Sequence, residues 1–247
     1  MTISKWFNSY FLMLRWVFLS SRPWLSLNLA VQIMIAVGFI YGISFFYPVI
    51  TPDIAKYVIT GAPTLIMLTV GLVMVPQIVA NSRTEGTFDY IWSLPVPRMA
   101  HVAADATNVF GTTLPGTILA VILGSTYFNF SLEISPLVIP AVLLIAMCGT
   151  FIGYSIAFAV PKPMMVNVIT QVLVFFVMLF SPVMFPIDRL PGWLQAIHRV
   201  LPIEYMADLI RGTLTDLNVN LGLAFAVTGA WCVAGFIVTT LMVRRRQ

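Results

Sequence analysis

Charged residues are scarce in this sequence. They make up 9% of its 247 residues, whereas 60% are hydrophobic and the mean hydropathy is +0.96. Soluble domains contain about 25% charged residues, so the polar surface available here cannot cover a single soluble core. The composition therefore excludes a soluble enzyme, a disordered chain and a coiled coil, and it indicates that lipid surrounds much of the chain.

Cysteine and histidine are also scarce, which limits the chemistry that the chain can carry. Cys148 and Cys232 both lie in apolar runs, which argues against a disulfide framework and against a zinc site with four ligands. His101 and His198 fall on opposite sides of the membrane in the topology below, and no histidine pair has metal-binding spacing. None of the three lysines follows a glycine, so the P-loop that cradles ATP phosphates is absent. We therefore expect no metal site, no cofactor and no catalytic residue on this chain.

Six apolar runs are long enough to cross a hydrocarbon core about 30 Å thick, which needs about 20 helical residues. They are Trp24–Tyr47, Tyr57–Ala80, Val102–Phe128, Pro136–Val160, Pro163–Pro182 and Leu221–Val243. The sequence thus predicts an all-α membrane protein whose six transmembrane helices form one domain over residues 23–247. An even number of spans places both ends of the chain on the same side.

Lysine and arginine are distributed unevenly between the two sides. With cytoplasmic ends, the cytoplasmic segments carry nine of these residues and the outer segments carry four. The positive-inside rule therefore predicts a multi-pass protein of the cytoplasmic (inner) membrane with both termini in the cytoplasm. The same bias accounts for the net charge of +4 without a nucleic acid as partner.

Residues 1–22 are too polar to span a membrane, but they are amphipathic. At 100° per residue one face of a helix carries Trp6, Phe7, Tyr10, Phe11 and Leu14. Such a stripe predicts a helix that lies on the cytoplasmic leaflet with its apolar face among the acyl chains. A signal peptide is the alternative, but the apolar stretch is interrupted and no small-residue cleavage site follows.

The 38 residues between the fifth and sixth spans, 183–220, form the longest connection. Proline and glycine divide it into two amphipathic pieces, Trp193–Leu201 and Ile203–Leu214, which are too short to span. We predict that both dip into the outer leaflet as re-entrant or interfacial helices, with Trp193, Leu194 and Ile197 on one face of the first. The candidate outer-gate residues are Pro186, Trp193, Leu194, Ile197, Asp208 and Arg211.

A few polar side chains fall within the spans. Amides four residues apart occur twice, and one acid accompanies an amide near the cytoplasmic end of the third span; these residues are Asn28, Gln32, Asn167, Gln171, Asp105 and Asn108. Amides in hydrocarbon need partners, so these faces should point inward or across a subunit interface. Asp105 is either a functional acid or a carboxylate that reaches the interface.

Small residues recur every four positions at Gly149, Gly153 and Ala157 in the fourth span. Such a stripe lets a second helix approach closely. We therefore predict a helix contact along this face.

The cytoplasmic segment 83–98 combines charges with aromatic residues and ends at two prolines. A solvated elbow between two spans would explain the charges. Exposure of Phe88, Tyr90 and Trp92 to water would be costly. A docking surface for a soluble partner explains both the charges and the aromatic residues.

Two groups of motifs then suggest a family. The first reads Arg83-Thr-Glu-Gly-Thr-Phe-Asp89 with Pro95-Val-Pro-Arg98. The second reads Phe185-Pro-Ile-Asp-Arg-Leu-Pro-Gly-Trp-Leu-Gln195, followed by Leu201-Pro and Asp208-Leu-Ile-Arg-Gly212. In this order and topology they resemble the membrane subunit of type-2 ABC exporters, the group that contains drug-resistance, Nod-factor and polysaccharide permeases.

The resemblance implies a permease that pairs with a second permease subunit, identical or different. Each would engage an ABC ATP-binding subunit, which would carry ATP and magnesium. Coupling to that ATPase would fall to the first motif, with Arg83, Glu85, Gly86, Thr87, Phe88 and Asp89. The cargo would be lipidic, amphipathic or a glycan.

The alternative from another class is a self-sufficient channel or a proton-coupled secondary transporter that uses Asp105. Prolines at 63, 76 and 115 offer kinks in the spans, but no inverted repeat accompanies them.

Overall fold

The computed structural model describes residues 3–46 and 50–245, which form helices and connecting loops without a strand in these two ranges. The helices are α1 (Ile3–Phe46), α2 (Pro52–Thr69), the π-helix η1 (Val70–Met74), α3 (Val75–Thr84), α4 (Thr87–Ser93), α5 (Arg98–Tyr127), α6 (Val138–Ala159), α7 (Pro163–Phe180), the 3-10 helix η2 (Ile187–Arg189), α8 (Gly192–His198), α9 (Pro202–Leu214) and α10 (Leu221–Arg245). The predicted all-α fold is confirmed.

Six helices of the described chain are long and apolar enough to cross a membrane. Each overlaps one of the six predicted runs. The first extends from Lys5 to Ile43 and so begins well before the predicted Trp24, and the second extends without a break through α2, η1 and α3, from Pro52 to Thr84. The first run was predicted to end at Tyr47, which lies outside the described residues. The two predicted pieces of the long connection are also present, as α8 and α9.

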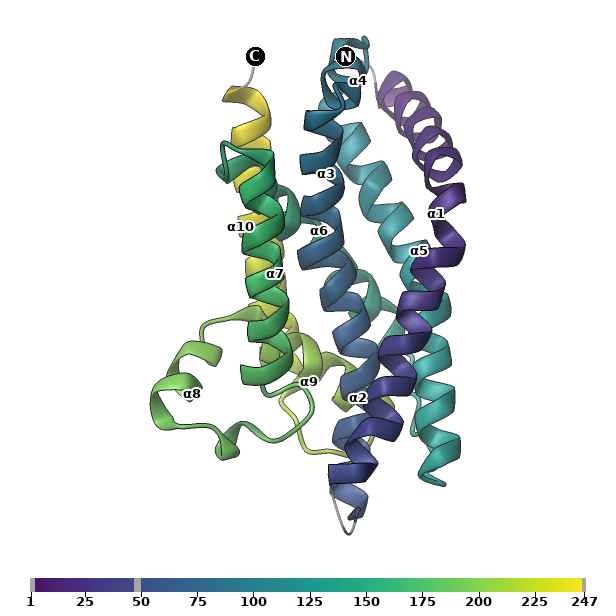
Figure 1. Cartoon of the computed structure of the whole chain (residues 1–247), viewed down its shortest axis with the longest axis vertical. Helices are drawn as coiled ribbons and strands as arrows, with labels where there is room; N and C mark the ends of the chain where they lie inside the picture. Colours follow the sequence, from purple (N-terminus) through teal and green to yellow (C-terminus); the bar gives the residue numbers. More distant parts are fainter. Residues whose placement is uncertain (1–2, 47–49, 246–247) are drawn as a thin grey trace.

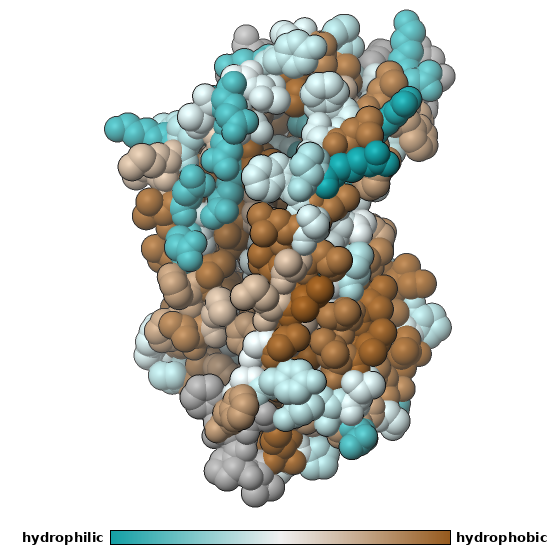
Figure 2. Space-filling view, turned by 45° about the vertical axis from the view of Figure 1, so that its right-hand side comes forward, coloured by the Kyte–Doolittle hydropathy of each residue, from teal (hydrophilic) through white to brown (hydrophobic). Residues whose placement is uncertain are grey.

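Different helices lie at the two ends of the helix bundle (Figure 1). The start of α1, the short helix α4 and the end of α10 lie together at one end, and α8 lies toward the other. Figure 2 shows hydrophobic residues over the middle and lower parts of one face, with most hydrophilic residues at the upper end. This arrangement suits a protein whose central belt meets lipid.

Helix α1 is continuous through the predicted boundary between residues 22 and 23. Pro23 lies inside the helix, and the helix changes direction along its first half (Figure 1), as expected where a proline removes one backbone hydrogen bond. The leading part is fastened to α5, because the hydroxyl groups of Tyr10 and Thr107 are 2.8 Å apart. Its aromatic stripe is partly uncovered: Phe7 is 51% and Phe11 62% exposed, whereas Trp6 and Tyr10 are half-buried. That this part lies on the cytoplasmic leaflet stays a prediction.

The span formed by α2 and α3 is the centre of the fold. In its most apolar stretch 89% of the residues are buried, compared with 17% for α7 and 22% for α10. Helices α5, α6 and α9 all pack against α2. The outer helices therefore turn most of their apolar surface toward lipid or toward another subunit.

The π-helix η1 marks the closest approach of two helices. Pro76 has no N–H and its ring crowds the preceding turn, and the wider π turn just before it accommodates this defect. A methyl group added to Gly71 would lie 2.8 Å from the Cα of Gly149, and one added to Gly153 would collide with the carbonyl of Gly71. The predicted helix contact along the small residues of α6 is thus confirmed.

Candidate coupling and translocation sites

Gly86 forms the turn of the candidate coupling segment. It lies between α3 and α4 with φ of 76°, in the left-handed region that glycine adopts at little cost. The N–H of Tyr90 then donates to the Gly86 carbonyl at 3.1 Å, which starts α4. Gly86 thus allows the chain to turn between α3 and α4.

Arg83 fastens this segment to the neighbouring span. Its guanidinium donates to the carbonyls of Ala157 at 2.8 Å, Val160 at 3.2 Å and Pro161 at 2.8 Å. The last carbonyls of a helix have no partner within the helix, and a cation there also complements the helix dipole. Arg83 therefore caps the C-terminal end of α6.

Phe88 lies in the core, so the expectation that it belongs to an exposed surface is wrong. Its side chain is 5% exposed, and its ring centroid lies 4.4 Å from that of Trp92 and 5.8 Å from that of Phe158 on α6. The guanidinium carbon of Arg98 lies 4.4 Å from the centre of the Trp92 ring. These contacts bury most of the aromatic surface that the sequence left unexplained.

The exposed part of the segment is acidic. Glu85, Gly86 and Asp89 are exposed, Thr87 is half-buried, and Tyr90 is 58% exposed. Two carboxylates and a tyrosine thus project from a turn that Arg83 and Phe88 hold against α6. The segment therefore presents two carboxylates to the solvent on a turn that is fixed to α6.

The outer segment has an inner and an outer face, and the two were predicted incorrectly for α8. Trp193 is 65% and Ile197 41% exposed, but Leu194 is 1% exposed, and His198, one turn further along the helix, is also buried. The ring of His198 stacks on Phe176, and its Nε2 lies 2.8 Å from the carbonyl oxygen of Phe180 at the end of α7. Leu194 therefore holds α8 in place instead of facing a cargo.

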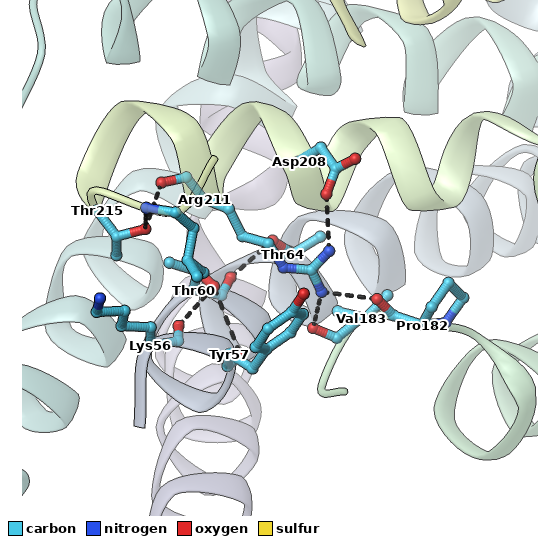
Figure 3. A network of polar contacts seen from close by, with 10 residues as sticks. Lys56, Tyr57, Thr60, Thr64, Pro182, Val183, Asp208, Arg211 and Thr215 are labelled. Carbon is cyan, nitrogen blue, oxygen red and sulfur yellow. Dashed lines mark hydrogen bonds and ion pairs between the residues drawn. The ribbon is translucent and has the colours of Figure 1, made fainter. Parts of the chain in front are cut away.

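Arg211 of α9 joins three parts of the outer side (Figure 3). Its guanidinium donates to Asp208 at 2.8 Å and to the carbonyls of Pro182 at 2.6 Å and Val183 at 2.5 Å, and it lies 4.4 Å above the ring of Tyr57 on α2. The residue is only 3% exposed. An arginine so deeply buried needs this set of acceptors.

Two further acids lie near this network. Burial, reinforced by the charge of Asp208, raises the pKa of Glu204 to about 7. Asp216 lies 2.6 Å from the ammonium of Lys56, and that hydrogen bond lowers the pKa of Asp216. Pro186, the other candidate of this segment, is half-buried and precedes η2.

The amide pair on α1 points inward, as predicted. Gln32 is 1% exposed and donates to Asn28 at 2.8 Å and to the carbonyl of Thr112 on α5 at 3.1 Å. A Cβ at Gly116 would collide with the Gln32 side chain. These contacts describe a structural link between α1 and α5.

The second amide pair is uncovered. Asn167 and Gln171 are exposed on α7, and together with Gln77 and Asn81 of α3 they line a groove of about 540 Å³. The side-chain amide of Gln77 on α3 donates to the hydroxyl of Thr170 on α7 at 2.9 Å. Four amides along a groove at membrane depth favour an aqueous path or a second subunit over lipid.

Asp105 is held by two partners that sequence reasoning did not bring together. The hydroxyl of Tyr154 on α6 donates to its carboxylate. His101, one turn earlier on α5, has its Nε2 3.8 Å from the same oxygen. Spacing of four residues could have indicated His101, whereas no local pattern points to Tyr154. Asn108 accepts a hydrogen bond from Ser21 at 3.4 Å.

The family model described as ABC-2 type transporter matches residues 10–215. The chain belongs to this family. Two curated relatives are both described as nodulation protein J. The one from Rhizobium leguminosarum bv. viciae is 32% identical over 146 residues, or 58% of this chain and 54% of the relative. The one from Rhizobium meliloti (strain 1021) is 36% identical over 78 residues, or 31% of this chain and 30% of the relative. The chain thus matches about half the length or less of these relatives.

Membership confirms the resemblance seen in the motifs. As a member of this family, the chain is the membrane component of an ABC-2 type transporter. The family assignment supports a component of an ABC transporter over a self-sufficient channel or a proton-coupled transporter. The contacts of Asp105 with Tyr154 and His101 are then best explained as a polar link between α5 and α6.

Proposed function

We propose that this chain is the permease subunit of an ATP-driven exporter. Two permease subunits, identical or homologous, would form the path, and each would bind a separate ATP-binding subunit that carries ATP and magnesium. The proposed cargo is lipidic, amphipathic or a glycan. The termini would be cytoplasmic, in the inner membrane.

The observation that carries the proposal is the α3–α4 turn. Glu85 and Asp89 are exposed on a segment that Arg83 and Phe88 anchor to the bundle. In a solvated elbow, exposed carboxylates contribute about 0–1 kcal/mol each. At a buried interface, reversal of one such charge costs about 2–5 kcal/mol.

The anchoring contacts offer a route for the ATPase stroke. A push on α4 would reach α6 through Phe88 and Phe158, whose ring centroids are 5.8 Å apart. It would reach α3 directly through the turn at Gly86, and α6 again through the three carbonyls bound by Arg83. Helices α3 and α6 would then move as one unit.

The cargo path is proposed along the amide groove of α3 and α7. Because α7 is largely uncovered, a second permease subunit placed against it would enclose Gln77, Asn81, Asn167 and Gln171. Cargo would leave past α8, where Trp193 and Ile197 are exposed. Replacement of Trp193 by Asp should therefore impair export and leave ATPase binding intact.

The test of coupling is Glu85→Arg in proteoliposomes that contain both subunits. We expect normal expression and pairing of the permease, loss of transport, and ATP hydrolysis that is lost or no longer stimulated by cargo. The matched control is Glu133→Arg, which reverses an exposed charge in the α5–α6 connection and should retain both activities. Wild-type transport and stimulation in Glu85→Arg would show that this turn does not couple the ATPase.

A further inference from the structure

A groove between α1 and α5, distinct from the amide groove above, has a volume of about 660 Å³. This lies within the range of roughly 300–1,000 Å³ typical of small-molecule sites. Its walls come from α1 on both sides of Pro23 and from the middle of α5. Two polar contacts between the same helices, Tyr10 with Thr107 and Ser21 with Asn108, hold these walls together.

The groove is mostly apolar, and apart from Thr112 its polar lining residues gather toward one end, where Phe11, Leu14 and Phe18 also line it. Arg15, Thr107 and Asn108 lie toward the starts of α1 and α5, whereas Leu29 and Pro115 lie deeper in the bundle. Thr107 and Pro115 are eight residues apart, or about 12 Å along α5. A molecule with a polar head and an apolar tail matches this gradient.

Arg15 determines the charge of that head. It is exposed and lines the groove, and within residues 3–46 and 50–245 no carboxylate lies within ion-pairing distance of it. An arginine beside an apolar groove is stabilised by an anion that accepts its fork of donors. By the distribution of basic residues, this end of α1 lies at the cytoplasmic leaflet, where anionic headgroups attract basic residues.

We propose that this groove binds one phospholipid with an anionic headgroup, drawn from the surrounding leaflet. Arg15 pairs with a headgroup whose phosphate charge is not offset by a cation, and an acyl chain fills the groove beside Leu25 and Leu29. The bound lipid fills the space between α1 and α5 beside the bend at Pro23. The site is separate from cargo transport, and its test does not depend on the proposed function.

Gly111 of α5 provides a direct way to close the groove. It lines the groove, and a Cβ added there meets no other atom within 4 Å. A leucine at this position would therefore extend into the groove from an unobstructed Cβ, and it favours a helix more than glycine does. Gly229 of α10 is the matched control, because its added Cβ also meets nothing within 4 Å.

The experiment counts lipids retained by the purified transporter. The protein is reconstituted in an equimolar mixture of phosphatidylglycerol and phosphatidylcholine and then examined by native mass spectrometry. We expect one phosphatidylglycerol per chain, preferred about fivefold over phosphatidylcholine, the ratio that corresponds to about 1 kcal/mol for one basic residue at an anionic surface. Arg15→Gln should lose the preference, and Gly111→Leu should lose the lipid.

The controls are Lys162→Gln, which removes an exposed cation before α7, and Gly229→Leu; both should behave as wild type. Retention of the lipid by Gly111→Leu, or equal binding of the two lipids by wild type, would overturn the proposal. A changed oligomeric state in Gly111→Leu would also overturn it, because the groove would then be an interface between copies. If Gly111→Leu fails to fold, Arg15→Gln alone still decides the headgroup preference.

Discussion

The guanidinium of Arg83 donates to the carbonyl oxygen of Ala157 at 2.8 Å, so α6 ends on a side chain from the candidate coupling segment. Sequence reasoning placed Arg83 at a docking surface. In the structure its donors are directed to carbonyls of its own chain, and the exposed charges beside it are those of Glu85 and Asp89. The segment therefore has an anchoring residue and acidic residues that remain available to a partner.

Replacement of Arg211 should destabilise the outer side strongly. Arg211→Met removes the donors from Asp208 and from two buried carbonyls, and breaking a buried pair in this way costs about 3–5 kcal/mol. Arg211→Lys should retain only part of this stability, because a single ammonium group cannot reproduce the planar fork of donors. Thermal unfolding in detergent measures both. Arg199→Met, at an exposed position, should change little; an equal loss there would contradict the role of the network.

Glu204 should make the outer segment less stable as the pH rises. Its folded pKa is about 7, compared with 4.5 for an ordinary glutamate, so the folded state holds a proton that the unfolded state releases. The stabilising contribution is complete below pH 4.5 and is lost as the pH rises through 7. His198 acts in the opposite direction, because burial lowers its pKa and its protonation opposes folding below about pH 6.5.

The two effects can be separated with Glu204→Gln. The difference in unfolding temperature, wild type minus Glu204→Gln, should decrease as the pH is raised from 5 to 8. The contribution of His198 is present in both proteins and cancels in this difference. Glu133→Gln, at an exposed position, serves as control and should show no such trend. A difference that does not vary with pH would mean that Glu204 is ionised throughout.

The contact between η1 and α6 should not tolerate a side chain. Gly153→Ala forces a methyl group against the carbonyl of Gly71, and overpacking of this kind costs about 1–3 kcal/mol. Gly229→Ala places the same methyl group in open space and should be neutral or slightly stabilising. Comparison of the two unfolding temperatures provides the measurement, and equal values would show that the helices separate easily.

Single cysteines should report opposite sides of the membrane from α4 and α8. Ser93 and Ala196 are exposed, and Cys148 and Cys232 are buried and can be replaced. In intact cells an impermeant maleimide should label Ala196→Cys and spare Ser93→Cys. Labelling of Ser93→Cys from outside would reverse the proposed orientation.

Patterns that depend on local spacing were sufficient for much of the fold. Hydropathy located all six spans, and proline and glycine located α8 and α9. The left-handed turn at Gly86 was also predictable, because glycine adopts this conformation more easily than other residues. The repeat of Gly149 and Gly153 predicted a close helix contact, although it could not identify η1 as the partner.

Contacts between distant segments could not be predicted in this way. Asp105 was identified as an intramembrane acid, but Tyr154 lies 49 residues further on, and only the packing of α5 against α6 brings them together. The aromatic side chain of Phe88 was placed outside because Phe158 was not known to be its neighbour. The inner face of α8 was missed for the same reason, since a seven-residue helix has too few turns to define a buried stripe.

The extra residue in the turn at η1 also sets an angle. An α-helix advances by about 100° per residue, and a π turn fits about one residue more into a full turn than an α turn does. The side chains after η1 are therefore set back by about 100° relative to an uninterrupted α-helix of the same sequence, and the side of α3 that presents Gln77 and Asn81 to the groove with α7 depends on this offset. Conversion of Val70–Met74 to a regular α-helix without a deletion would turn the two amides away from the groove, whereas deletion of one residue from this stretch would restore the α-helix and leave them in place.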